Sequence, residues 1–481
     1  MTMGSVDRTT DTLPFRVILG ALIAILLTAM LSVSCACDVE EESLVQLSLA
    51  DAVSKALGEN VQVKQQESSY QDALSGLRTS GFKTSFGWGT DARVDRWPGD
   101  SDVSGVVFGD VTYESFGGTQ ATVDFTPLGL GTERGAFGLT FRHPLMRGSG
   151  VLSSKAERVA GARSNVSVEE KQLFLTRQAK LVDVVRSYYQ AVLSRDQVTV
   201  QERAVDNAET ALRGAEARLR EGMVAGIEAT RAKIQVSQTK DALNRVVENG
   251  RDAMDRLMVA IGSGVGGTPV LTDAVPEVEP DVPDLAKAIE TALANRGELF
   301  VFDQQISDQE RKLALAADEL RPSLYAVAGY SSMSSDRGLV TGSALRLGDF
   351  TAGFEMRFPV DRRSIREGRD IAERGLDILQ QLRTYRMEQI TEDVRQACRS
   401  VERSRKSLGI LGGNLEDALE NLRLARLMVT EGVGSNRDVL DAQSALTRAE
   451  SGLLAAKVDL YLATLDLEYS KGEDLTKIGL Q

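Results

Sequence analysis

A stretch of twelve residues occurs twice in this chain, 210 positions apart. The first copy is Glu221–Ala232 (EGMVAGIEATRA) and the second is Glu431–Ala442 (EGVGSNRDVLDA), and apolar positions on both sides match in the same register. A repeat with so long a period indicates two related halves rather than the short units of a solenoid. In each copy a glycine ends a helical pattern, where it adopts a left-handed backbone at low cost. The sequence therefore predicts one helical hairpin with a tight tip in each half.

The residues after the second tip alternate small and large apolar side chains in steps of four and three. This heptad spacing predicts a long helix that packs against a neighbour with a left-handed supercoil. The positions are Ala442, Leu446, Ala449, Leu453, Ala456, Leu460, Ala463 and Leu467. The first half repeats the spacing more loosely between Val236 and Leu257. Because alanine and glycine let backbones approach closely, the pattern favours thin helical walls over a bulky core.

Composition excludes several classes of function. The net charge is −13, which argues against a nucleic-acid partner. One histidine and three cysteines offer little for metal sites or thiol chemistry. The glycine-rich stretch Gly262–Gly267 lacks the Lys-Ser/Thr of a phosphate-binding loop, so we interpret it as a linker. We therefore expect no enzyme, no cofactor and no metal site.

The first 37 residues are expected to be an export signal. Arg8 and Arg16 precede about fifteen mostly apolar residues, a run shorter than a bilayer-spanning helix needs. The sequence LSVSCAC that follows resembles a bacterial lipoprotein cleavage site, with Cys35 or Cys37 as the acylated residue.

The rest of the chain is expected to alternate helices and strands twice. We predict a first repeat over 38–262, a linker over 263–283, a second repeat over 284–471 and a tail over 472–481. Each repeat contains one helix of about 69 residues, Ser153–Glu221 or Arg363–Glu431. Shorter helices are expected to stack end to end beside them, Leu47–Ser80 with Arg437–Ser470, or Glu228–Ile261 with Asp284–Leu320.

The strands show the alternation of a membrane β-strand. Phe350, Phe354 and Phe358 share one face of such a strand, while Glu355 and Arg357 lie on the other. Shorter alternations occur over 82–95, 121–125, 137–142 and 324–330, and the stretch from Pro98 to about Gly118 has the composition of a long loop. Whether 121–125 and 137–142 form one strand or two is left open. With about four strands per chain, one copy cannot close a barrel, which needs about eight. Oligomerisation follows from the strand prediction.

Several motifs resemble those of the TolC-like outer-membrane efflux proteins. They are FRHPLMRGSG (Phe141–Gly150), RPSL (Arg321–Leu324), FPVDRRS (Phe358–Ser364) and EGVGSNRDVLDAQSAL (Glu431–Leu446). The resemblance implies a mostly α fold with membrane β, in which duplicated helical hairpins form an α-barrel tunnel. Four strands per protomer would contribute to a trimeric 12-stranded β-barrel in the outer membrane of a Gram-negative-type cell.

The same resemblance implies a passive trimeric export duct with a long periplasmic extension. Its partners would be a periplasmic adaptor, also called a membrane fusion protein, and an inner-membrane transporter. Together they would form a tripartite efflux pump or a type I secretion system. The alternative is a periplasmic coiled-coil adaptor or scaffold, which would share the hairpins but carry one hairpin between small β-domains. The exported substrate is left open.

Two groups of residues at the tips are candidate sites. Exposed apolar side chains and bare backbone at Gly222, Met223, Val224, Gly432, Val433 and Gly434 are candidates for adaptor docking, or simply helix ends. Glu228, Asp438 and Asp441 are candidates for an acidic gate, since relatives constrict their entrance with acidic rings; Asp438 also suits a helix cap. Where relatives carry an Arg and a Tyr that hold the closed state, this sequence has Gly434 and Val429, and Arg437 is the nearest substitute.

Overall fold

The computed structural model describes residues 46–81, 84–97, 100–130, 136–222, 226–264, 269–277, 284–333, 348–431 and 433–476. The chain divides into two compact units, Met1–Gln46 with Thr268–Val270, and Leu47–Gly267 with Leu271–Gln481. Almost all of the first unit lies outside the described residues, including Cys35 and Cys37, so the account below concerns the second unit. Met223, Val224 and Gly432 also lie outside the described residues.

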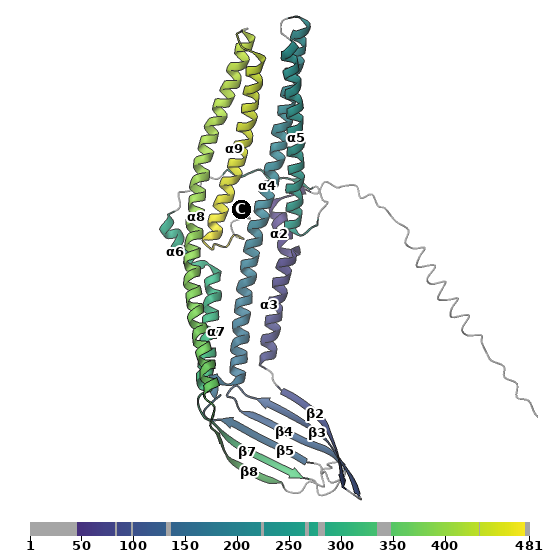
Figure 1. Ribbon diagram of the computed structural model, residues 1–481, viewed down its shortest axis with the longest axis vertical. Coiled ribbons are helices and arrows are strands. Elements are labelled where there is room, and N and C mark those ends of the chain that lie inside the picture. The colour runs from purple at the N-terminus through teal and green to yellow at the C-terminus, as the bar shows by residue number, and fades with distance from the viewer. Residues whose placement is uncertain are drawn as a thin grey trace, which may run out of the picture. The chain divides into compact units, whose positions relative to one another are not determined.

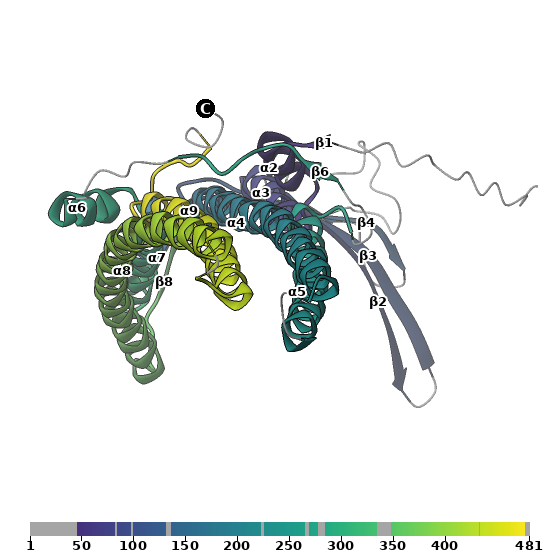
Figure 2. The same cartoon turned by 90° about the horizontal axis from the view of Figure 1, so that it is seen from above.

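Both halves form the predicted long helix and helical hairpin, drawn in Figure 1. The helices are α2 (Leu49–Glu59), α3 (Val61–Ser80), α4 (Ser154–Arg220), α5 (Gly226–Ile261), α6 (Leu285–Asn295), α7 (Gly297–Asp318), α8 (Arg363–Thr430) and α9 (Asn436–Ser470). Toward the tips α8 packs on α9, α9 on α4, and α4 on α5; toward the sheet α8 packs on α7, α7 on α4, and α4 on α3. In Figure 2 the helices α8, α9, α4 and α5 stand side by side along one curve, and α6 lies outside it. None of the helices in the described part of the chain combines the length and apolarity needed to cross a lipid bilayer.

The predicted heptad seam is the packing face of α9. Ala442, Ala456, Leu460, Ala463 and Leu467 are all buried, and α9 packs along α8. The largest apolar cluster lies midway along the helices, where Tyr188 and Val192 of α4 meet α2 and the end of α5. The core is therefore a thin layer between helices, as small seam residues dictate.

The short helices are broken and stacked by the same contact in each half. Asn60 separates α2 from α3 and donates from Nδ2 to the Ala260 carbonyl at 3.0 Å. Arg296 separates α6 from α7 and donates from Nε to the Ser470 carbonyl at 2.9 Å. Ala260 and Ser470 are themselves 210 positions apart, so the two contacts are equivalent.

Two glycines make this close approach possible. Gly262 ends α5 at φ +87°, and a Cβ there would lie 3.2 Å from the Asn60 Cα. Gly472 follows α9 at φ +73°, and a Cβ there would lie 3.0 Å from the Arg296 nitrogen. Therefore α5 stacks on the short helices α2 and α3, and α9 stacks on α6 and α7. In both cases the stacked helices belong to the same half of the chain. The predicted end-to-end stacking is confirmed, but the predicted partners from opposite halves are wrong.

One antiparallel sheet of six strands continues from the ends of the helices. Its strands are β2 (Thr84–Trp97), β3 (Asp100–Glu114), β4 (Gln120–Leu130), β5 (Ala136–Pro144), β7 (Ser323–Met333) and β8 (Asp349–Arg357), paired in that order. Gln46–Leu47 (β1) and Val270–Leu271 (β6) form a separate two-stranded sheet. The predicted class, helical hairpins with membrane-type strands, is confirmed. The prediction of four strands is wrong for two reasons: the stretch predicted as a loop contains β3, and the alternations 121–125 and 137–142 belong to two separate strands, β4 and β5.

Glycines within β2 and β3 explain that error. A Cβ at Gly109 would lie 2.5 Å from the Phe125 ring of β4, so the ring needs the bare backbone opposite it. Gly87 faces the Asp110 carboxylate in the same way. Glycine in a strand marks such close approaches, but in a sequence it also marks loops.

The two faces of the sheet differ in polarity as the alternation predicts. On one face Arg142 of β5 pairs with Glu355 of β8 at 3.0 Å, and its guanidinium lies 3.8 Å from the centroid of the Tyr325 ring. On the other face Phe350 and Phe354 are 74% and 77% exposed. An exposed aromatic face opposite a charged face is typical of a strand between lipid and a polar lumen.

Candidate functional site

The two helix tips are built by different turns. At the first, Gly222 follows α4 with φ +75°, the left-handed conformation that ends many helices. At the second, the Val433 and Gly434 amides both donate to the Met428 carbonyl, at 3.0 and 2.9 Å. A Cβ at Gly434 would lie 2.8 Å from the Met428 Cβ, so this position requires glycine. The Val433 side chain is left 77% exposed at the end of the hairpin.

Asp438 is held in a capping box at the start of α9. Its carboxylate accepts from the Ser435 backbone amide at 2.8 Å, and its own amide donates to Ser435 Oγ at 3.4 Å. The hydrogen bond from the Ser435 amide, helped by the Ser435 side chain and Arg437, lowers the pKa of Asp438. Asp438 is therefore a fixed negative charge at neutral pH, bound to its own helix end rather than to the neighbouring hairpin.

Glu228 and Asp441, by contrast, line one groove between α5 and α9. Asp441 lies 3.5 Å from Arg437, one helical turn earlier, and both side chains are exposed. The groove is lined by Glu228, Arg231, Ile234, Gln235, Asn436, Arg437, Leu440 and Asp441. The structure thus brings two of the three predicted gate carboxylates together with two arginines, and leaves Asp438 in the cap.

A contact that the sequence analysis missed joins the two hairpins at the same level. Arg218, near the end of α4, donates to the Asn436 side-chain oxygen at 3.4 Å, and Asn436 is buried. The positions equivalent to these residues in the opposite half are Met428 and Gly226. The sequence signal for this contact was that the two repeats differ at these positions. The first half has the cation Arg218 where the second has Met428, and the second half has the polar Asn436 where the first has Gly226.

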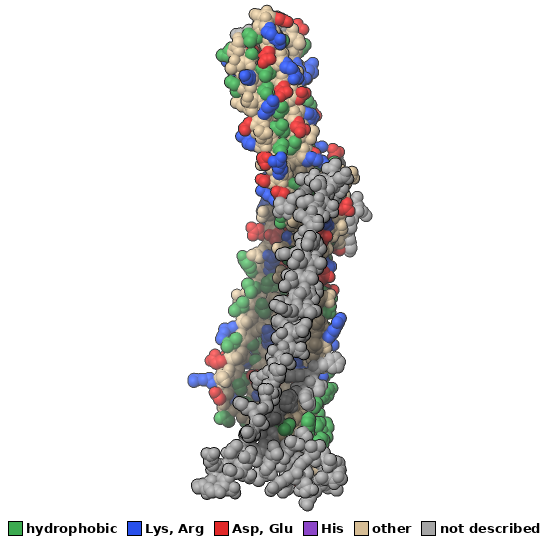
Figure 3. Space-filling view, turned by 90° about the vertical axis from the view of Figure 1, so that its right-hand side faces the viewer, with side chains coloured by type: hydrophobic (Ala, Val, Ile, Leu, Met, Phe, Trp, Pro, Cys, Tyr) green, Lys and Arg blue, Asp and Glu red, His purple; other side chains and the backbone are tan. Residues whose placement is uncertain are grey.

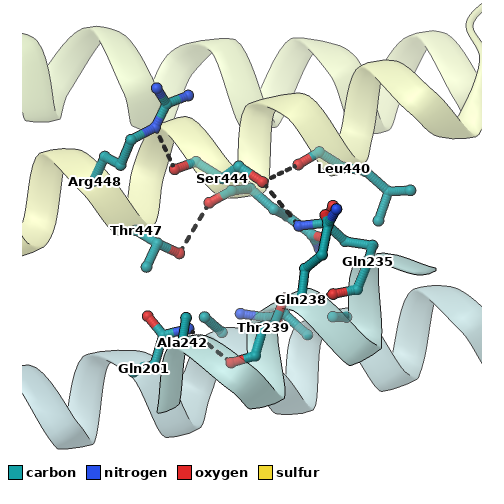
Figure 4. Close-up of a pocket in the computed structure, with 13 residues that line it drawn as sticks. Gln201, Gln235, Gln238, Thr239, Ala242, Leu440, Ser444, Thr447 and Arg448 are labelled. Carbon is teal, nitrogen blue, oxygen red and sulfur yellow. Dashed lines mark hydrogen bonds between the residues drawn. The ribbon is translucent and has the colours of Figure 1, made fainter. Parts of the chain in front are cut away.

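Further from the tips, polar side chains continue between the hairpins. Gln235 of α5 donates to Ser444 Oγ of α9 at 3.3 Å, and the two side chains point toward one another in Figure 4. Beside this seam, within the first hairpin, Gln201 of α4 donates to the Thr239 carbonyl of α5 at 3.2 Å. Long apolar side chains are scarce along this seam, and Leu440 is an exception. A polar seam is cheaper to separate than an apolar one, because water replaces its hydrogen bonds.

The tips carry charged side chains and exposed apolar side chains. Among the residues that the structure describes, no three His, Cys, Asp or Glu side chains cluster as metal ligands. Acidic and basic side chains are interspersed at the tip end of the face drawn in Figure 3. Such a surface suits ion passage and docking of a protein partner.

Comparison with known proteins places this fold in a family. The profile of the family described as "Outer membrane efflux protein" matches residues 118–263 and 288–473, which include both hairpins. No protein with a curated description matches the sequence.

Solved structures share the fold at low identity. CusC has a TM-score of 0.70 and 15% identity, over 89% of this chain and 93% of its own. The CmeC outer membrane channel of Campylobacter jejuni has a TM-score of 0.69 and 14% identity, over 89% and 86%. The outer membrane protein VceC of Vibrio cholerae has a TM-score of 0.68 and 13% identity, over 88% and 96%. At these identities the likeness establishes the fold alone.

Proposed function

Because this chain belongs to the outer membrane efflux protein family, we propose that it is the passive outer-membrane duct of a tripartite efflux pump or a type I secretion system. Three copies would form the duct, with a periplasmic adaptor and an inner-membrane transporter completing the path. The family is one of outer-membrane transport ducts and not of enzymes. Its profile covers both hairpins, which removes the alternative of a single-hairpin periplasmic adaptor.

The proposal extends to the ends of the chain. Residues 1–37 would direct export, with Cys35 or Cys37 as a lipid attachment site. The repeats 38–262 and 284–471 would each supply one hairpin to the tunnel wall, joined by the linker 263–283 and followed by the tail 472–481. The apolar run and the cysteines that follow it support the export signal. The 210-residue repeat supports one hairpin in each half.

The observation that supports a gated duct best is the groove at the tips. Glu228 of the first hairpin and Asp441 of the second lie on the same groove. In a trimer the groove would recur three times around one axis and bring like charges together at the tunnel entrance. Opening would then separate the hairpins along their polar seam, where Gln235 and Ser444 meet, and would break the contact of Arg218 with Asn436.

The gate residues have distinct roles in this proposal. Asp438, whose lowered pKa keeps it ionised, supplies fixed negative charge. Arg437 offsets the charge of Asp441 in the closed state. A ring with net negative charge favours the entry of cations.

Planar-bilayer recordings test the gate. The triple variant Glu228→Gln, Asp438→Asn and Asp441→Asn removes the charges while keeping side-chain shape and an acceptor for the Ser435 amide. We expect its reversal potential in a salt gradient to shift toward that of a non-selective pore. Block by trivalent cations from the periplasmic side should also be lost.

Asp241→Asn is the matched control. Asp241 is an exposed carboxylate on α5 that pairs with Arg245 four residues later, just as Asp441 pairs with Arg437 four residues earlier, but it lies beyond the groove. The control should retain the selectivity and block of the natural chain. If the triple variant shows the same selectivity and block as the natural chain, these carboxylates stabilise helix ends and do not form a gate.

A further inference from the structure

A short segment of the linker between the two halves contacts helices of both. It comprises Leu271–Glu277, and we call it the strap. We propose that the strap holds α4 and α9 together midway along the helices, so that the two hairpins part only on the tip side of it. This inference rests on the proposed opening of the duct by separation of the hairpins, and it adds the level at which that separation stops.

The strap is bound firmly to the first half of the chain. Arg195 of α4 donates from Nη1 to the Leu271 carbonyl at 2.7 Å. The Asp273 carboxylate accepts from the Leu49 amide at 2.7 Å and from the Tyr188 hydroxyl at 3.1 Å. Leu49 is the first residue of α2, where an amide lacks a partner within its own helix and an anion is favoured. The Tyr188 side chain is buried completely, so its hydroxyl needs partners within the protein.

The strap also reaches the second half of the chain. Lys457 of α9 donates from Nζ to Glu277 Oε1 at 3.2 Å. One turn further along α9, the Tyr461 ring packs edge-on against Tyr189 of α4, with the ring centroids 4.5 Å apart. Val458, between Lys457 and Tyr461, is 1% exposed. We call this aromatic and apolar part of the contact between α4 and α9 the waist seam.

The strap packs against the waist seam itself. Val275 contacts the apolar cluster that contains Tyr189 and Val458. Asp273, two residues earlier, fixes the strap at this position through its bonds to α2 and α4. The ion pair to α9 contributes little by itself, because its carboxylate side chain is 87% exposed. Asp273 and Val275 are therefore the residues that carry the proposed role.

The contact between the hairpins changes character on the tip side of the strap. There Ser444, Thr447 and Arg448 of α9 line a cavity of about 210 Å³ together with residues of α4 and α5 (Figure 4). A polar cavity of this size admits water, which can replace the hydrogen bonds across it when the hairpins part. At the waist seam, parting would expose two tyrosine rings and Val458 to water. The free energy needed to part the hairpins therefore rises between Thr447 and Val458.

Cysteine pairs across the hairpins in the full-length chain test where the separation stops. Gln235→Cys with Ser444→Cys lies on the tip side, where the natural side chains meet at 3.3 Å. Arg186→Cys with Asp466→Cys is the matched pair beyond Tyr461, where the natural side chains meet at 2.6 Å. Each pair is joined by a short bifunctional thiol reagent, and single-cysteine variants give the background from the natural cysteines.

The readout is the open-channel current in planar bilayers. We expect the link on the tip side to abolish this current and the link between positions 186 and 466 to leave it unchanged. Loss of current with both links would mean that the waist seam moves as well, and would overturn this inference alone. Unchanged current with both links would count against the proposed opening by hairpin separation, and with it against the inference.

Asp273→Ala tests the strap directly, because it removes the acceptor for Leu49 and Tyr188. We expect the open-channel current to rise, since the hairpins can then part further toward the sheet. The link between positions 186 and 466 should return the current to its natural level by replacing the strap. Asp273→Asn keeps an acceptor oxygen and should match the natural chain.

The amount of heat-resistant oligomer shows whether these variants assemble. If Asp273→Ala does not assemble, Val275→Ser gives the same test, because it weakens the apolar contact of the strap and leaves the start of α2 intact. An assembled variant with the natural current, or a raised current that the link does not lower, would make the strap a passive connection and overturn the proposal.

Discussion

Single polar residues carry much of the order in a molecule whose core is thin. Arg296, at the break between α6 and α7, is 8% exposed and binds three groups. Besides the Ser470 carbonyl it pairs with Glu298 at 2.9 Å and Asp393 at 3.5 Å. Glu298 also pairs with Arg386 of α8 at 3.2 Å, so one carboxylate joins two helices. Burial alone would raise the pKa of Glu298, but Arg296, the backbone and Arg386 together lower it.

We expect Glu298→Gln to lower the free energy of unfolding by about 1–3 kcal/mol, because two guanidinium groups lose their shared anion. The loss depends on pH in a defined direction. The lowered pKa means that Glu298 stabilises the fold fully above its unfolded pKa of about 4.3, and that this contribution disappears as the pH falls through the folded value. Chemical unfolding at pH 7 and pH 3 should give a smaller difference from the natural chain at the lower pH. An undiminished difference at pH 3 would contradict the assignment to charge.

At the scale of elements, the strand β8 has one apolar face and one charged face. Phe350 and Phe354 project from one face, while Thr351 and Glu355 belong to the other by their alternate positions. Glu355 contacts both Arg142 and Arg357, so it lies within a cluster of charges. We assign the phenylalanine face to lipid and the charged face to the lumen.

Phe354→Arg should therefore reduce insertion into the outer membrane, because arginine near the middle of a bilayer costs roughly 2–4 kcal/mol. Thr351→Arg is the matched control on the charged face, and it should insert at the level of the natural chain. It is a better control than Glu355→Arg, which would place three arginines together. The measurement is the amount of heat-resistant oligomer in outer membranes. Equal amounts of both variants would refute the assignment of faces.

At the scale of the whole molecule, the tips are the proposed meeting point with an adaptor. Val433, in the turn between α8 and α9, exposes an apolar side chain outside the helix–helix seams. Ile227 at the first tip is 58% exposed. Gly434 is unsuitable as a test position, since any side chain there collides with Met428 and distorts the turn itself.

A photo-crosslinking residue at Val433 should form an adduct with a periplasmic adaptor in intact cells, identified by mass spectrometry. Val61 is the matched position, because it is a valine 76% exposed at the start of α3, far along the chain from either tip. Adduct formation at 433 without formation at 61 is the expected outcome. Equal yields at both positions, or none at 433, would leave the tips as turns only.

Periodicity predicted the helices well because they are long and their seams are regular. The spacing from Ala442 to Leu467 defined both the helix and its buried face. The break at Asn60 escaped prediction, because asparagine there caps α3 while its side chain reaches a carbonyl 200 residues later. The strand β3 escaped for a related reason, since Gly109 is explained only by the Phe125 ring on the next strand. At the tips the sequence predicted the capping of Asp438, but the link from Arg218 to Asn436 depends on how two hairpins meet.

The equivalent contacts at Asn60 and Arg296 divide each half into a tip-side and a membrane-side part. On the tip side every helix of one hairpin faces its partner through a heptad seam, and the membrane-side part is fixed separately to the sheet. Whole heptads inserted at matching levels into both arms of both hairpins would preserve each seam and leave Asn60, Arg296 and the sheet untouched. The reach of the molecule across the periplasm is thus adjustable in evolution by paired seven-residue insertions, independently of the part held in the membrane.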